Sequence, residues 1–149
     1  MPNWIENNAP KLLNKKILYL CMEMMIPELN EDCRQANFKG GLGLLAGDTM
    51  EGFKNLGLDV TAVIPIYNSR WKQAFQDNTQ RIIIKHVDYI GEPIEPLSGN
   101  DGEQVVLNVD FEGVCYPIKV FKMMRAGVPV YLLYNDEVFD ILYNSDRKS

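Results

Sequence analysis

Three closely spaced glycines, Gly40, Gly41 and Gly43, are the residues of this sequence whose type and spacing are best suited to chemistry. They lie just before an apolar pattern with helical spacing. Glycine is unfavourable within a helix, so such a run indicates backbone that turns sharply or lies very close to another group. A glycine turn at a helix N-terminus exposes backbone N–H groups beside partial positive charge, which favours phosphate. A tight strand-to-helix turn without a ligand explains the same residues, and the motif alone leaves both interpretations open.

The spacing Gly-Gly-x-Gly differs from two well-known phosphate-binding patterns. It is not the dinucleotide pattern Gly-x-Gly-x-x-Gly, and no Lys-Ser or Lys-Thr pair follows it as in a P-loop. A second candidate for ligand binding is Glu23, which directly follows a buried apolar segment, because ligands bind at the carboxyl ends of strands in open α/β sheets. The alternative for Glu23 is a structural role, in which it binds backbone N–H groups of a loop.

The remaining reactive side chains predict neither a catalytic residue nor a metal site. His86 is the only histidine and lies in a strand-like segment, so we expect it on a solvated strand face rather than as a catalytic base. The three cysteines lack the paired short spacing of a zinc site and are odd in number, which argues against a disulfide framework. We expect reduced, largely buried thiols at Cys21, Cys33 and Cys115.

The composition predicts one globular domain that acts neither on nucleic acid nor in a membrane. The chain has 149 residues, of which 46% are hydrophobic, and a net charge of -5, with no basic cluster longer than Lys15-Lys16. No apolar run approaches the ~20 residues that span a bilayer, and the N-terminus lacks the basic-then-apolar order of a signal peptide. We therefore expect a cytoplasmic protein.

The elements that must position the glycine turn form a βαβ unit. Residues 17–22 and 60–66 are apolar and predict two buried strands, which should be parallel, and residues 42–56 predict an amphipathic helix between them. The connection over residues 23–39 is long for a strand-to-helix link, which suggests a functional loop or an extra short element.

The second half of the sequence predicts an antiparallel excursion from this sheet. Glu112-Gly113 should turn residues 105–111 into residues 116–122 as a hairpin, and residues 128–133 should return to the main sheet. Residues 81–87 also have strand character, and residues 135–144 predict a short helix. Two or three parallel strands are too few for a complete doubly wound domain, so we interpret the chain as a piece of something larger.

Four segments resemble one known family. "ILYLCMEMM", "KGGLGLLAGDTMEGFKNLGLDV", "GEPIEPLSGNDG" and "GVPVYLLYNDEVFDILYN" look, in this order, like the N-terminal part of the glycogen and α-glucan phosphorylases, especially the shorter prokaryotic kind. The resemblance implies an α/β glycosyltransferase of the GT-B type with two Rossmann-like domains. Residues 1–149 would form a partial N-terminal domain, and the C-terminal cofactor domain would be absent from this chain.

The resemblance also implies an activity and its partners. Phosphorylases use phosphate to release glucose 1-phosphate from α-1,4-glucan (glycogen or maltodextrin), with pyridoxal phosphate held as a Schiff base by the C-terminal domain. By this match Gly40, Gly41, Leu42 and Gly43 would contact substrate and cofactor phosphates through their backbone, with Glu23 nearby. The chain alone should be inactive and bind no cofactor, and its partners would be α-glucan, phosphate and the remainder of the parent chain.

Two other interpretations stay open. A glycogen or starch synthase has the same architecture and a similar glycine loop, although the Ala-Gly-Asp step after the loop and the segment "EPIEPLSGNDG" favour a phosphorylase. A non-catalytic glucan-binding or interaction module would use only this half of the fold. Where the second domain or the remaining strands should dock, we expect an exposed apolar face that makes the isolated chain prone to self-association.

Overall fold

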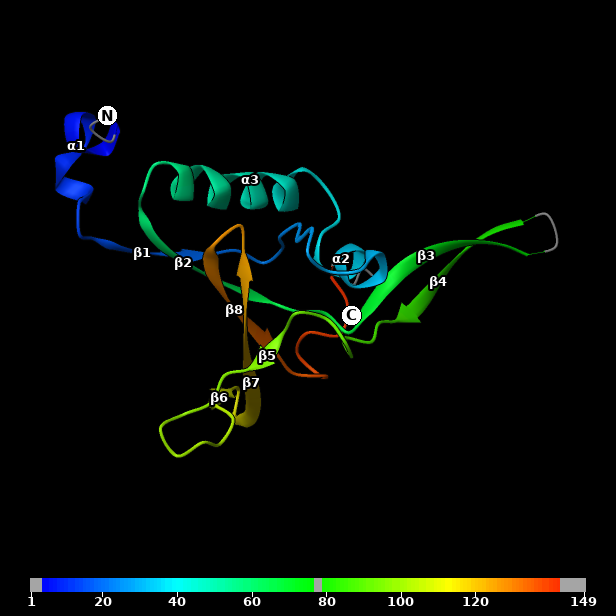
Figure 1. The fold of residues 1–149 in the computed structure, drawn as a ribbon. Helices are drawn as coiled ribbons and strands as arrows, with labels where there is room; N and C mark the ends of the chain where they lie inside the picture. The colour runs from blue at the N-terminus through cyan, green and yellow to red at the C-terminus, as the bar shows by residue number, and fades with distance from the viewer. Residues whose placement is uncertain (1–3, 77–78, 143–149) are drawn as a thin grey trace.

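The computed structural model of the protein describes residues 4–76 and 79–142, and it consists of an α/β body from which a long β-hairpin projects (Figure 1). The body holds a six-stranded mixed sheet, in which β6 pairs with β7 beside the path β1-β2-β8-β7-β5. The elements of the chain are α1 (Trp4–Asn8), η1 (Pro10–Leu12), β1 (Lys16–Leu20), α2 (Glu31–Asn37), α3 (Gly41–Asn55), β2 (Asp59–Pro65), β3 (Ser69–Gln76), β4 (Thr79–His86), β5 (Glu95–Pro96), β6 (Val106–Phe111), β7 (Val114–Arg125) and β8 (Val128–Tyr134).

The predicted βαβ unit is confirmed, but the prediction that its first strand is buried is wrong. β1 is the edge strand of the sheet, and no described element covers one of its faces, so that Leu18 and Leu20 are 62% and 68% exposed. Strands β1 and β2 are parallel, with Ile17 opposite Val60, and α3 lies between them in the chain. The buried face of α3 carries Ala46 and Met50, which pack in one core cluster with Val60 and other residues of the sheet. The predicted return to the main sheet is also confirmed, because β8 is parallel to β2.

The antiparallel excursion is confirmed as well. Strands β6 and β7 form a hairpin whose two-residue turn is Glu112 and Gly113, with φ of 50° and 81°. Positive φ at both positions is the geometry that matches the twist of the flanking strands, and glycine adopts it without strain. Strand β7 then pairs antiparallel with β8 and so joins the hairpin to the parallel core.

The predicted helix over residues 135–144 is wrong for the part that the structure describes, residues 135–142. Only one turn forms, in which the side chain of Asn135 accepts hydrogen bonds from the backbone N–H groups of Glu137 and Val138. After this turn the chain lies beside the start of β3, because the carbonyl of Asp140 accepts a hydrogen bond from the backbone N–H of Ser69 at 2.9 Å. Pairing with a distant strand thus replaces the local helix. Residues 143 and 144 lie outside the described residues.

The long connection before the glycine turn contains the helix α2. Asn30 caps this helix by accepting a hydrogen bond from the backbone N–H of Cys33 at 3.0 Å, and Glu31 and Asp32 lie in its first turn, where the helix dipole favours acidic residues. The helix α2 is therefore the extra short element that the length of this connection suggested. Across residues 4–76 and 79–142, no helix has the length and apolar character needed to cross a membrane.

Candidate functional site

The glycine turn forms the N-terminus of α3. Gly40 is the cap residue, the helix begins at Gly41, and within the described part of the chain no side chain caps this end. The first N–H groups of a helix have no partner within the helix, so here they face the surroundings with the positive end of the helix dipole. Gly40 and Gly41 are exposed, and Leu42 is 48% exposed.

The space around the glycines differs from one position to the next. A Cβ atom on Gly43 would lie 2.4 Å from the Cβ atom of Phe38, so packing requires glycine there. A Cβ atom on Gly40 or Gly41 would meet nothing within 4 Å, and neither residue has a positive φ. The contacts of the described residues therefore explain Gly43, whereas at Gly40 and Gly41 a Cβ atom would point into open space and no contact of the described residues requires glycine.

The end of β1 holds this turn in place. Glu23 is 2% exposed, and its Oε2 accepts a hydrogen bond from the backbone N–H of Lys39 at 2.9 Å. The backbone N–H of Met25 donates to the carbonyl of Gly43 at 2.9 Å. This is the contact with loop backbone that the structural interpretation of Glu23 requires, and direct binding of a ligand by Glu23 stays a prediction.

A buried polar network fixes the residues that lead into the turn. The side-chain amide of Asn37 donates to the carbonyl of Cys33 at 2.7 Å and to the hydroxyl of Tyr89 at 2.6 Å, and its oxygen accepts from the backbone N–H of Tyr67. Burial raises the pKa of Tyr89 above its usual range, so this hydroxyl stays neutral and donates to the carbonyl of Tyr67. The sequence analysis missed Asn37 and Tyr89, because their partners are distant in the chain.

Two basic side chains, Lys39 and Arg70, lie beside the turn, and each has a carboxylate nearby. Burial, and then the nearby guanidinium of Arg70, lower the pKa of Lys39, although Glu23 opposes this shift. Arg70 is 9% exposed and donates to Gln35 at 2.6 Å and to Asp32, yet among the described residues its Nε has no partner.

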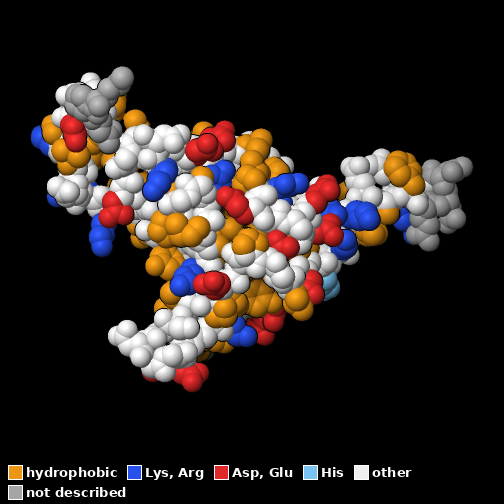
Figure 2. All heavy atoms as spheres, in the orientation of Figure 1, with side chains coloured by type: hydrophobic (Ala, Val, Ile, Leu, Met, Phe, Trp, Pro, Cys, Tyr) orange, Lys and Arg blue, Asp and Glu red, His pale blue; other side chains and the backbone are white. Residues whose placement is uncertain are grey.

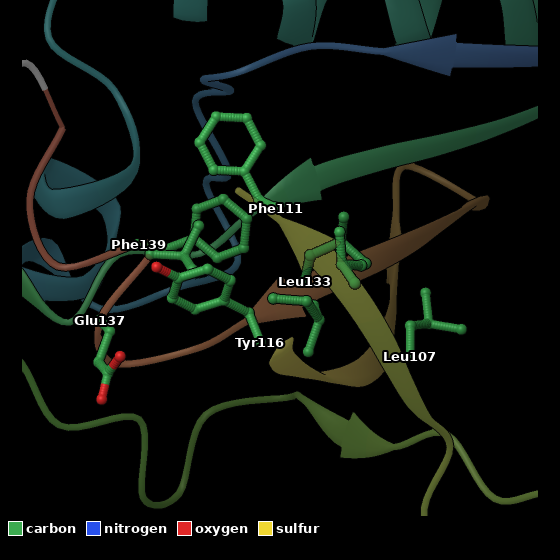
Figure 3. A pocket seen from close by; sticks show the side chains of 9 residues that line it. Leu107, Phe111, Tyr116, Leu133, Glu137 and Phe139 are labelled. Atoms are coloured by element: carbon green, nitrogen blue, oxygen red, sulfur yellow. The ribbon is translucent and has the colours of Figure 1, made fainter. Parts of the chain in front are cut away.

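Two hollows adjoin each other, and one of them lies beside the turn. One, of about 390 Å³, is lined by Leu42 and by residues at or near the carboxyl ends of β1, β2 and β8. The other, of about 490 Å³, is lined by β6, β7 and residues 137–139, and Phe139 and Leu133 border both. In Figure 3 the side chains of Phe111, Tyr116 and Phe139 gather around the second hollow. Its lining is mostly apolar, which agrees with the expected exposed apolar face.

A serine, a histidine and an aspartate meet near the base of the projecting hairpin without forming a catalytic triad. Ser69 Oγ lies 3.3 Å from Nδ1 of His86 and 3.0 Å from Oδ1 of Asp140. In a triad the aspartate orients the histidine, whereas here both groups contact the serine, which is 1% exposed. The arrangement binds residues 139–141 to β3.

The cysteines differ in exposure. All three thiols are free; Cys33 is buried, Cys21 is half-buried and Cys115 is exposed. The expectation of largely buried thiols is therefore wrong for Cys115, which lies at the start of β7, where the hairpin extends beyond the covered part of the sheet. Within the described ranges, no group of three or more His, Cys, Asp or Glu side chains could hold a metal ion.

Comparisons with curated proteins find phosphorylases. The chain is 28% identical to the maltodextrin phosphorylase of Thermococcus litoralis over 96% of its own length and 18% of that protein. It is 26% identical to the glycogen phosphorylase of Mycobacterium tuberculosis over 94% of its own length and 17% of that protein. These similarities confirm the resemblance to phosphorylases, and the chain spans less than a fifth of the length of these relatives.

One family model matches most of the chain, and one solved structure resembles it weakly. The chain superposes on the catalytic domain of starch synthase IV from Arabidopsis thaliana, bound to ADP and acarbose, with a TM-score of 0.47 and 16% identity, over 79% of this chain and 18% of that one. The family model described as the starch synthase catalytic domain matches residues 16–149. Because this match includes every strand of the sheet, the α3 helix and the glycine turn, the chain belongs to the family of the starch synthase catalytic domain.

Proposed function

We propose that this chain is the N-terminal part of an α-glucan phosphorylase, which transfers a glucosyl unit from the end of an α-1,4-glucan to phosphate. The observation that supports the proposal is the uncapped N-terminus of α3, where Gly40 and Gly41 leave space that no described residue fills. Backbone N–H groups at such an end bind phosphate oxygens without a charged side chain. The curated relatives are named as phosphorylases, which agrees with this chemistry.

In this proposal the residues of the chain bind and orient rather than react. The N–H groups of Gly41, Leu42 and Gly43 donate to a phosphate or to a glucosyl hydroxyl. Glu23 positions the turn through the backbone N–H of Lys39, and the charge of Arg70 adds positive potential. The hollow at the carboxyl ends of the parallel strands accepts the glucan beside Leu42.

Pyridoxal phosphate is the cofactor that a phosphorylase requires, and its phosphate group supplies proton transfer when the cofactor is bound. The open space at Gly40 and Gly41 leaves room for a phosphate group to approach the first backbone N–H groups of α3. We assign no Schiff-base lysine to this chain, so we propose that residues beyond these 149 hold most of the cofactor. The isolated chain is therefore expected to be inactive.

The family model favours a second candidate, a glucan synthase that uses a sugar nucleotide. The same glycine turn would then face the diphosphate of the donor instead of free phosphate, since both are anions of similar geometry. A non-catalytic module that only binds glucan is a third possibility, in which the turn would bind sugar hydroxyls.

One assay separates these candidates. The full product of the gene is incubated with maltodextrin and phosphate, with and without pyridoxal phosphate, and glucose 1-phosphate is measured. Release that depends on pyridoxal phosphate is the expected result. Glucosyl transfer from ADP-glucose to maltodextrin, without release of glucose 1-phosphate, would support the synthase instead. Binding of maltodextrin with neither reaction would support the non-catalytic module.

A further inference from the structure

One charged side chain is buried in the body of the protein without an ion pair. Most charged side chains lie on the surface, and many are visible in Figure 2, where water solvates them. Arg125, the last residue of β7, is instead 3% exposed. Within residues 4–76 and 79–142 its guanidinium forms no ion pair, whereas buried Arg70 is paired with Asp32. A buried charge is costly, and an apolar side chain of similar volume often packs at least as well, so packing alone does not explain Arg125.

The register of the sheet directs Arg125 toward α3. Arg125 lies opposite Val128 of β8, and paired residues share a face of the sheet. Val128 belongs to the core cluster that contains Ala46 and Met50 of α3. The guanidinium therefore lies on the side of the sheet that α3 covers.

The contact of this guanidinium with α3 explains a glycine in the interior of the helix. Gly47 is buried, and a Cβ atom there would lie 2.8 Å from Nη2 of Arg125 and 3.0 Å from the carbonyl oxygen of Met25. Glycine is less favourable than alanine inside a helix. At Gly47 the guanidinium and the carbonyl that it binds occupy the place that a methyl group would take.

One residue, Met25, connects Arg125 to the glycine turn. Nε of Arg125 donates a hydrogen bond to the carbonyl of Met25 at 3.1 Å. The backbone N–H of Met25 donates to the carbonyl of Gly43, in the first turn of α3, at 2.9 Å. Both backbone groups of Met25 are thus bound, one by the arginine and the other by the start of the helix. A shift of Met25 would therefore change its contact with the first turn of α3.

The backbone of Arg125 is itself held in place. The next two residues, Ala126 and Gly127, form the tight turn between β7 and β8, with φ of 46° and 78°. The backbone N–H of Ala126 donates to Oε1 of Glu28 at 3.2 Å, which fastens this turn to the segment that contains Met25. The guanidinium therefore reaches Met25 from a fixed base.

We propose that Arg125 is a positioning residue for the glycine turn. Through Met25 it fixes the first turn of α3, so that the backbone N–H groups of Gly41 and Leu42 stay directed at a bound phosphate, which Arg125 itself does not touch. The inference rests on the proposed function, in which these N–H groups bind phosphate. Arginine suits this role because its planar guanidinium fills the space beside Gly47 and donates to the carbonyl of Met25 at the same time.

Kinetics of the full gene product test the proposal, with release of glucose 1-phosphate as the assay. Arg125→Met keeps a long apolar stem and removes the donor. It should raise KM for phosphate about tenfold and leave kcat and KM for maltodextrin within about twofold of the parent. Arg125→Lys keeps a donor within reach of Met25 and should recover most of this loss. Arg81→Met, at an exposed arginine of β4, should leave all three constants unchanged.

A second set of variants tests the contact at Gly47. Gly47→Ala pushes the guanidinium away from Met25 and should also raise KM for phosphate. The double variant with Arg125→Met should be no worse than the weaker single variant, because both changes remove the same contact. Gly52→Ala, in the same helix with open space around it, is the matched control and should leave KM for phosphate unchanged.

Hydrogen exchange of the same full-length proteins gives a readout that requires no activity. Arg125→Met should accelerate exchange at Met25 and over residues 44–47 at least ~10-fold, while residues 60–64 of β2 exchange as in the parent. Absence of glucose 1-phosphate release from the parent would contradict the proposed function, and hydrogen exchange would still decide the role of Arg125.

Three results would overturn the proposal. The first is an unchanged KM for phosphate in an active Arg125→Met variant, or a loss of kcat alone in proportion to the folded fraction, which indicates a role in stability only. The second is a double variant in which the effects of Gly47→Ala and Arg125→Met simply add. The third is hydrogen exchange that Arg125→Met leaves unchanged at Met25 or accelerates equally in β2.

Discussion

The carboxylate of Glu23 accepts a hydrogen bond from the backbone N–H of Lys39 at 2.9 Å and so ties the end of β1 to the residue before the glycine turn. Sixteen positions separate these residues in the chain. The contact lets a buried carboxylate orient a turn that it does not itself form. The open end of α3 therefore depends on a residue in the neighbouring segment.

Replacing Glu23 should destabilise the protein in a graded manner. Glu23→Ala removes the acceptor and leaves a backbone N–H unsatisfied, so the free energy of unfolding should fall by about 1.5–3 kcal/mol. Glu23→Gln keeps an acceptor oxygen without charge and should cost about half as much. Urea unfolding of both variants measures the difference. Equal losses in the two variants would show that charge, rather than the hydrogen bond to Lys39, is what matters.

The glycines of α3 should respond differently to alanine. Gly43→Ala places a Cβ atom against Phe38 and should reduce the free energy of unfolding by about 1–3 kcal/mol. Gly52→Ala lies in an exposed helix interior with open space around it and should raise the free energy of unfolding by up to about 1 kcal/mol. Thermal unfolding measures the stability of both variants against that of the parent. A neutral Gly43→Ala would contradict the packing reason for glycine at this position.

The ion pairs of Asp32 should make stability depend on acid pH. Hydrogen bonds from Lys85, and then from Arg70, lower the pKa of Asp32. The stabilisation is therefore fully present above the unfolded-state pKa of about 3.9 and is lost as pH falls through the lower folded-state pKa. It should amount to about 1 kcal/mol or less, because Asp32 and Lys85 are partly exposed. Asp32→Asn should be less stable than the parent at pH 7, with a difference that shrinks in acid.

A control keeps this measurement specific. Asp59→Asn, at the exposed start of β2, should have the same free energy of unfolding as the parent at pH 7 and at pH 2. A constant difference between Asp32→Asn and the parent from pH 7 to pH 2 would exclude titration of Asp32 as the cause.

The thiols should react in an order set by their surroundings. Burial raises the pKa of Cys33 to about 11, so at pH 8 it is protonated as well as covered. Cys115 is exposed and should be alkylated by iodoacetamide long before Cys33, which should react only after unfolding. Peptide mass spectrometry follows each site, and Cys115→Ser should remove the fast reaction. Rapid labelling of Cys33 in the folded protein would contradict its burial.

Much of the fold could be predicted because local pattern and tertiary structure agree. The apolar strands β2 and β8 are largely buried in the parallel part of the sheet, with β1 pairing at its edge, and Gly113 follows Glu112 where a tight hairpin turn needs positive φ. The start of helix α2 could have been predicted from the sequence, since Asn30 followed by Glu31 and Asp32 is a typical helix start. Its seven residues have too little periodicity to show a buried face.

Other features depend on contacts that no local pattern contains. Residues 135–142 have helical character, but the bond between Asp140 and Ser69 binds them to a strand far away in the chain. Strand β3 contains both basic and apolar side chains, so its sequence alone does not predict a strand. Only its pairing with β4 in the structure identifies it as one. At the candidate site, the glycine motif was evident from the sequence. The packing of Gly43 on Phe38 and the network around Asn37 required the structure.

The most direct test of the central claim compares two glycine variants of the full gene product in the glucose 1-phosphate assay. Gly41→Ala adds a methyl group at the start of α3, where the phosphate is proposed to approach, and Gly52→Ala makes the same change in the same helix away from that end. If the turn binds phosphate, Gly41→Ala should lower kcat/KM at least ~10-fold, whereas Gly52→Ala should stay within about 2-fold of the parent. Equal activity in the two variants would contradict the claim that the glycine turn faces the reacting phosphate.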